Sequence, residues 1–190
     1  MPGCSAPNSS FHAELDALTG VYHRQALLAM LFRETDRVQR LHTALSVLLL
    51  GIDDFGDCDH WNSRLGTEAC HELLRQVARR TSRLLRSYDL LGRTGKDQFL
   101  IALPGCGTTE AARLAERLRH EVFRVRFPVG GESMRLSACF GIACSRGRSP
   151  LVVLRDAEEA LRCARASGPD SIQCCDEPLS REPMHLASAS

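Results

Sequence analysis

Hydrophobic and polar positions along the chain switch between helix-like and strand-like spacing. Apolar residues recur every three to four positions in four stretches, which predicts four amphipathic helices at 23–41, 67–86, 108–122 and 150–166. The stretch 44–52 is instead continuously apolar and is followed by Asp53 and Asp54. A short apolar run with such an end is typical of a strand buried on both faces. The pattern therefore predicts a central strand between the first two helices.

Shorter alternating stretches predict the remaining strands. Residues 89–94 and 99–103 flank the polar stretch Gly95–Gln98, which indicates a β-hairpin. Further strands are expected just before Gly130-Gly131, over 135–142 and over 171–174. The order α-β-α-β-β-α-β-β-α, followed by the short strand over 171–174, predicts an α/β (α+β) domain, in which helices flank a mixed central sheet of about five strands.

The chain is expected to form one folded unit, over residues 13–175. Residues 1–12 and 176–190 are rich in Ser, Pro and Ala without periodicity, which predicts flexible tails. The longest apolar run, Val47–Leu50, is far shorter than the roughly 20 residues that a membrane span needs. The first ten residues also lack the apolar core of a secretory signal. We therefore expect a cytoplasmic protein with no membrane partner.

Charge and cysteine content argue against three further classes of protein. The 24 Lys and Arg residues nearly balance the 23 Asp and Glu residues, which argues against a nucleic-acid partner. The nine cysteines form no Cys-x-x-Cys pair, which argues against a zinc ribbon or a thioredoxin-type site. Cys58, His60, Cys70 and His71 can be drawn as a metal site, but their spacing is not compact. Reduced thiols are the simpler interpretation.

Acidic residues follow predicted strands at two points. Asp53 and Asp54 come after the buried strand, and Asp97 lies at the tip of the hairpin. Carboxylates that converge from neighbouring strands are the ligands that a magnesium-dependent nucleotide enzyme needs. Acidic residues at strand ends are also common as solvated turn residues. Spacing alone leaves both interpretations open.

Several motifs together resemble the GGDEF, or diguanylate cyclase, family. Asp16–Gly20 followed by Arg24 resembles the family's entry motif, and Arg93–Phe99 resembles its Arg-x-Gly-Gly-Asp/Glu-Glu-Phe signature. Supporting matches lie at Gly51–Phe55, Ala115–Arg117, Ser137–Ala143 and Glu158–Gly168. The resemblance covers residues 16 to about 172 in the family's order. It implies a nucleotide-cyclase-like palm fold, in which a homodimer joins two GTP molecules into cyclic di-GMP with two Mg²⁺ ions for each GTP.

The family's catalytic residues are incompletely matched, so no residue is assigned as catalytic. In the loop Gly95, Lys96, Asp97, Gln98, Phe99, Lys96 replaces the second Gly and Gln98 replaces the Glu. Gly51 stands at the metal-binding Asp, which leaves Asp53 and Asp97 as the metal ligands implied for an active enzyme. The loss of two carboxylates at about 2–3 kcal/mol each slows a reaction roughly a thousandfold or more. A shifted register that moves Asp53 or Asp54 to the metal position would preserve activity.

The resemblance also implies altered nucleotide contacts. The family's phosphate-contacting Lys after the Phe corresponds to Gly56, and its later Lys corresponds to Arg165. Asn62 matches the guanine-binding Asn when three residues are inserted after Phe55, and the partner Asp then falls at His71. Asn62, His71 and Arg165 are therefore candidate nucleotide-binding residues, with GTP as the ligand.

A second family site is better matched. Arg86-Ser87-Tyr88-Asp89 matches the family's Arg-x-x-Asp inhibitory motif, and Arg117 corresponds to a further arginine that faces it. The resemblance implies that cyclic di-GMP binds Arg86, Asp89 and Arg117 without a cofactor. By itself the motif is also what an Arg-rich helix end next to a strand would produce by chance.

Three hypotheses follow from these matches. The first is an inactive GGDEF domain that acts as a cyclic di-GMP receptor or regulatory module. The second is a weakly active diguanylate cyclase that uses Mg²⁺. The third is a scaffold that binds neither nucleotide and acts through a homodimer or a protein partner. The missing metal ligand at Gly51 separates the first from the second, and the Arg-x-x-Asp motif separates the first from the third.

Overall fold

The computed structural model describes residues 14–53 and 66–175. The elements in chain order are β1 (Tyr22–His23), α2 (Arg24–Leu41), β2 (Leu45–Ile52), α4 (Thr67–Leu84), β3 (Leu90–Arg93), β4 (Gln98–Pro104), α5 (Thr108–Leu118), the π-helix η2 (Arg119–Phe123), β5 (Phe127–Val129), β6 (Glu132–Met134), β7 (Ala138–Cys144), α6 (Pro150–Ser167) and β8 (Ile172–Cys175). All four predicted helices are present, and the third ends in the π-helix. In the described part of the chain, no helix has the length and apolar character needed to cross a membrane.

The expected domain limits can be compared only in part with the structure. The described ranges, 14–53 and 66–175, lie within the predicted unit, 13–175. The expected tails, 1–12 and 176–190, lie outside the described residues. Their flexibility therefore stays a prediction.

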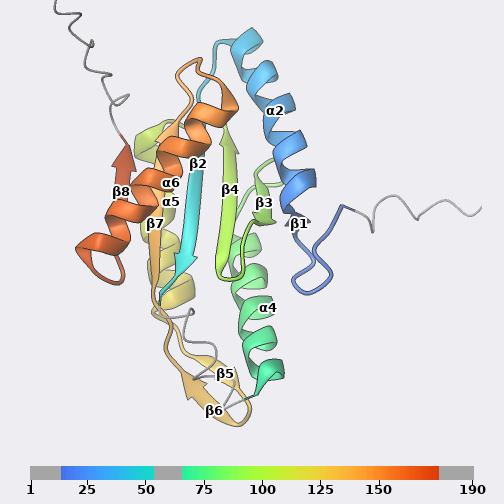
Figure 1. Ribbon diagram of the computed structural model, residues 1–190, viewed down its shortest axis with the longest axis vertical. Helices are drawn as coiled ribbons and strands as arrows, with labels where there is room; N and C mark the ends of the chain where they lie inside the picture. Colours follow the sequence, from blue (N-terminus) through green and yellow to red (C-terminus); the bar gives the residue numbers. More distant parts are fainter. Residues whose placement is uncertain (1–13, 54–65, 176–190) are drawn as a thin grey trace, which may run out of the picture.

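Six strands form the central sheet, in the order β1-β3-β4-β2-β7-β8 (Figure 1). Strand β2 pairs antiparallel with β4 and β7, whereas β1 with β3 and β7 with β8 run parallel. The prediction of about five strands missed β1, which is two residues long and too short to show a period. Strands β5 and β6 form a separate ribbon around Gly130-Gly131.

Strand β2 is buried along its whole length because helices cover both faces of the sheet. Leu48 and Leu50 pack in one core cluster with α4 and α5. Val47 and Leu49 belong to a second cluster with α2 and α6. This alternation follows from the two-residue period of a strand. Each buried leucine stabilises the fold by about 1.5–3 kcal/mol relative to an exposed one.

Helix α6 packs directly on strand β7 at Gly141. A Cβ atom at Gly141 would lie 2.2 Å from the backbone N of Leu161 and 2.3 Å from the carbonyl oxygen of Ala157. Near the start of the helix, the buried carboxylate of Asp156 pairs with Arg148. Because the helix lies so close to the sheet, its last turn reaches the end of β2, where the functional motifs gather.

Candidate functional site

The hairpin between β3 and β4 is held in shape by Arg93. Its Nε donates to the carbonyl oxygen of Gly95 at 3.1 Å, and its Nη2 donates to that of Lys96 at 2.8 Å. Its Nη1 lies 3.5 Å from Asp16 Oδ1. The predicted tip is confirmed, although Gln98 already begins β4. The entry motif and the signature loop, far apart in sequence, are therefore in contact.

Asp16 organises the entry turn. Its Oδ1 accepts hydrogen bonds from the backbone N and the hydroxyl of Thr19, at 3.0 and 2.6 Å. Partial burial alone would raise the pKa of Asp16, but the hydrogen bonds from Thr19 and the charge of Arg93 lower it. Asp16 is therefore ionised at neutral pH and serves the structure of the turn.

Arg165, in the last turn of α6, pairs with the central carboxylate of the signature loop. Its Nη2 donates to Asp97 Oδ2 at 2.9 Å. The guanidinium lies over Gly51, where an added Cβ would be 2.4 Å from Nη2 and 3.0 Å from Cζ. Gly51 therefore provides the space that this arginine occupies.

Asp53 is committed to a different contact. Its Oδ2 accepts from the backbone N of Asp170 at 2.9 Å, which fixes the turn before β8. Its own backbone N donates to the carbonyl oxygen of Ser137 at 3.0 Å. Burial, together with a hydrogen bond to Asp53, raises the pKa of the Cys139 thiol to about 11. Asp53 thus joins three separate segments at one end of the sheet.

These groups do not fit a Mg²⁺ ion, which prefers several oxygen ligands in near-octahedral geometry. Asp53 and Asp97, the two ligands expected for an active enzyme, are each bonded to a donor of the protein. Gly51 supplies no side chain, and the neutral Gln98 accepts from the hydroxyl of Thr94 at 3.3 Å. Among residues 14–53 and 66–175, no three His, Cys, Asp or Glu side chains are grouped to hold a metal ion.

The other sequence candidates at this end are only partly described. Asn62 lies outside the described residues, as do Cys58 and His60 of the drawn metal cluster. His71 lies in α4, with its Nδ1 3.7 Å from Glu68 Oε2. It is on the opposite face of the sheet from Arg165, because α4 and α6 pack in different core clusters.

A cavity of about 330 Å³ lies between the end of α4, the end of β4 and helix α5. Arg86, Asp89 and Arg117 all line it. The structure thus brings together the three residues that the sequence assigned to the second family site. We call this space the Arg86 cavity.

Within the Arg86 cavity, the two oxygens of Asp89 have different environments. Oδ2 accepts from the backbone N of Arg86 at 2.8 Å, whereas Oδ1 is buried and has no hydrogen-bond partner among the described residues. Burial raises the pKa of Asp89, although the hydrogen bond and the charge of Arg86 oppose this shift. The guanidinium of Arg86 donates to the hydroxyl of Tyr88 at 3.0 Å. The cavity therefore contains an acceptor with unused capacity beside a cation.

Three further polar residues that line the Arg86 cavity were not singled out as site residues from the sequence: Cys106, Glu110 and Arg113. The Arg113 guanidinium makes no hydrogen bond or ion pair within the part of the chain that the structure describes. Arg113 precedes Arg117 by one helical turn, and this spacing is a signal that could have identified it. Cys106 Sγ lies 3.8 Å from Arg86 Nη1, and burial raises the pKa of its thiol.

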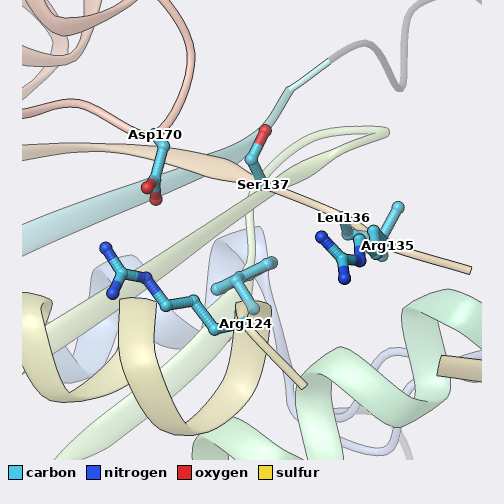
Figure 2. A pocket seen from close by; sticks show the side chains of 6 residues that line it. Arg124, Arg135, Leu136, Ser137 and Asp170 are labelled. Carbon is cyan, nitrogen blue, oxygen red and sulfur yellow. The ribbon is translucent and has the colours of Figure 1, made fainter. Parts of the chain in front are cut away.

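A wider hollow, of about 480 Å³, opens beside the start of β7. Figure 2 shows Arg124, Arg135 and Asp170 around it, with Ser137 from the segment that leads into β7. Arg124 Nη1 lies 3.3 Å from His120 Nδ1. No sequence motif pointed to this hollow.

Comparison with known proteins gives consistent matches. The profile of the family described as "Diguanylate cyclase, GGDEF domain" matches residues 13–171. The diguanylate cyclase DosC of Escherichia coli K12 is 32% identical over 162 residues, which are 84% of this chain and 34% of DosC. The chain therefore spans about a third of the length of this curated relative.

Two solved structures show the same fold. The diguanylate cyclase SiaD of Pseudomonas aeruginosa, solved in complex with its activator SiaC, has 31% identity and a TM-score of 0.79, over 87% of this chain and 63% of that chain. The GGDEF domain of DgcB from Caulobacter crescentus, solved with c-di-GMP, has 21% identity and a TM-score of 0.81, over 93% of this chain and 99% of that chain.

Proposed function

Because the chain belongs to the GGDEF, or diguanylate cyclase, family, we propose that it is a cyclic di-GMP receptor or regulatory module. The ligand binds in the Arg86 cavity. GGDEF domains bind GTP and cyclic di-GMP, and the chemistry of this cavity favours the second. The binding needs no metal or other cofactor.

The buried, unpartnered Oδ1 of Asp89 carries this proposal. A buried acceptor without a donor costs about 1–3 kcal/mol, which a ligand N–H group recovers on binding. The Watson–Crick edge of guanine presents such N–H groups. Arginine forks bind both phosphate oxygens and the acceptors O6 and N7 of guanine, and Arg86, Arg113 and Arg117 line the same cavity.

The same domain is proposed to be inactive, or nearly so, as a cyclase. Support comes from the signature end of the sheet, where Gly51 and Gln98 supply no carboxylate and Asp97 is bonded to Arg165. The second candidate is a weakly active diguanylate cyclase, which the identity with DosC favours. The third, a scaffold without a nucleotide ligand, becomes the conclusion when cyclic di-GMP does not bind.

Calorimetric titration with cyclic di-GMP tests the receptor proposal. We expect Arg86→Ala to weaken binding by about 1–3 kcal/mol, or roughly 5- to 150-fold, because a charge-assisted contact is lost. Arg33→Ala is the matched control, since Arg33 is an exposed arginine on α2, across the sheet from the cavity. Unchanged affinity in Arg86→Ala contradicts the site, and no binding by the unaltered chain contradicts the function.

A further inference from the structure

We propose that the guanidinium of Arg165 is the resident cation at the end of β2, and that it excludes divalent metal ions from this end of the sheet. The inference is independent of cyclic di-GMP, because it concerns Gly51, Asp97 and Arg165 rather than the Arg86 cavity. It explains why two carboxylates can remain here without forming a metal site.

Two glycines bring the arginine to this place. Gly141 lets α6 lie against the sheet, where any Cβ would strike the backbone of Leu161. Arg165 follows Leu161 by one helical turn, so its side chain is carried to the end of β2. Gly51 has no side chain, and the guanidinium of Arg165 lies in the space that a side chain at this position would fill.

Arg165 neutralises one of the two carboxylates at this position, that of Asp97. The positive charge of Arg165 lies 2.9 Å from Asp97, and its side chain is about half exposed, so the pair is accessible but occupied. A divalent ion that approached Asp97 would meet a cation of like charge within a few ångströms and would have to displace it. Of the residues that the structure describes, the other carboxylate at this end of β2 is Asp53, which is bonded to the backbone N of Asp170.

A carboxylate restored at position 51 therefore does not by itself create a metal site. The atom that it would displace is the far end of the flexible Arg165 side chain, which can move by a small rotation. After that rotation the guanidinium of Arg165 lies between the new carboxylate at position 51 and that of Asp97, and it is held more tightly than by Asp97 alone. Only the removal of Arg165 leaves the carboxylate at position 51 and that of Asp97 available to a metal ion.

Binding of Mn²⁺ to the full chain, followed by electron paramagnetic resonance, tests this inference. The variants are Gly51→Asp, Arg165→Gln and the two combined. Arg162→Gln is the control, because Arg162 is an exposed arginine on the same helix that pairs with Glu159. We expect the combined variant to bind Mn²⁺ at least about tenfold more tightly than Gly51→Asp. The unaltered chain and Arg162→Gln should show no saturable site.

Thermal unfolding without and with Mn²⁺ reports on the fold of each variant and gives a second readout. Mn²⁺ should raise the melting temperature of the combined variant but not that of Gly51→Asp. Should the combined variant fail to fold, Arg165→Gln alone decides, because it should bind Mn²⁺ more tightly than the unaltered chain. The inference is overturned when Gly51→Asp binds Mn²⁺ as tightly as the combined variant, or when Arg165→Gln leaves Mn²⁺ binding unchanged.

Discussion

Asp89 lies in the turn between α4 and β3, with one oxygen bonded to the backbone and the other buried without a partner. Burial raises its pKa above the ordinary carboxyl value. In the folded chain the proton is therefore held more tightly than in the unfolded chain, so protonation of this group stabilises the fold. The ionised form, by contrast, is the one that accepts hydrogen bonds from a ligand.

This difference predicts a pH dependence of cyclic di-GMP binding. Affinity should fall as the pH is lowered through the raised pKa of Asp89, which is reached before an ordinary carboxyl would protonate. Calorimetry between about pH 7 and about pH 4 measures the effect. Asp89→Asn, the control, should bind weakly at every pH and be no less stable at neutral pH. Affinity that does not change over this range would show that Asp89 does not contact the ligand.

Gly51 and Gln98 lead to a prediction about catalysis. Incubation with GTP and Mg²⁺, followed by chromatography, should show turnover well below about 1 per second, an ordinary enzyme rate. Gly51→Asp with Gln98→Glu should increase turnover only when Arg165 is also replaced by Gln, which removes the cation that is paired with Asp97. Turnover near the ordinary rate in the unaltered chain would favour the cyclase hypothesis.

At the level of elements, the contact of α6 with β7 is the one that positions Arg165. The contact depends on the absence of a side chain at Gly141, since the neighbouring atoms are helix backbone and cannot rotate away. The ion pair of Arg148 with the buried Asp156 fixes the start of the same helix. The packing of α6 on β7 therefore sets both the position of the helix and the position of Arg165 at the end of β2.

Gly141→Ala should destabilise the fold by roughly 1–3 kcal/mol, as expected when a packed core is overfilled. Urea unfolding measures the free energy. Gly107→Ala is the control, because its added Cβ would lie 3.1 Å from Glu110 Oε2, the far end of a side chain that can rotate away. Equal stability of the two variants would mean that α6 shifts without cost.

At the level of the whole molecule, the sequence predicted most of the fold because the long elements have clear periods. It predicted four helices, the buried strand and the hairpin, and missed β1, whose two residues have no measurable period. The three residues of the Arg-x-x-Asp site came from family spacing, and the structure places them on one cavity.

The features that the sequence could not predict are contacts between segments that lie far apart in the chain. The absence of a ligand at Gly51 was visible, but its occupation by Arg165 requires α6 to lie against the sheet. The spacing of Arg113 from Arg117 places both on one face of α5, but only the packing of α5 shows that this face lines the cavity. The commitment of Asp53 to the backbone of Asp170 joins residues 117 positions apart, beyond any local pattern.

The central place of β2 also affects how the chain is made. Its eight buried residues pair with β4 and β7, and β7 ends at Cys144. A ribosome that adds about 5–20 residues per second takes roughly 5–20 s to synthesise the chain between these strands. During that interval the apolar strand β2 has an unpaired edge. Partly folded chains with such an edge are the species that aggregate most readily. The yield of soluble protein should therefore depend on translation speed and chaperone supply, even though the finished fold buries this strand completely.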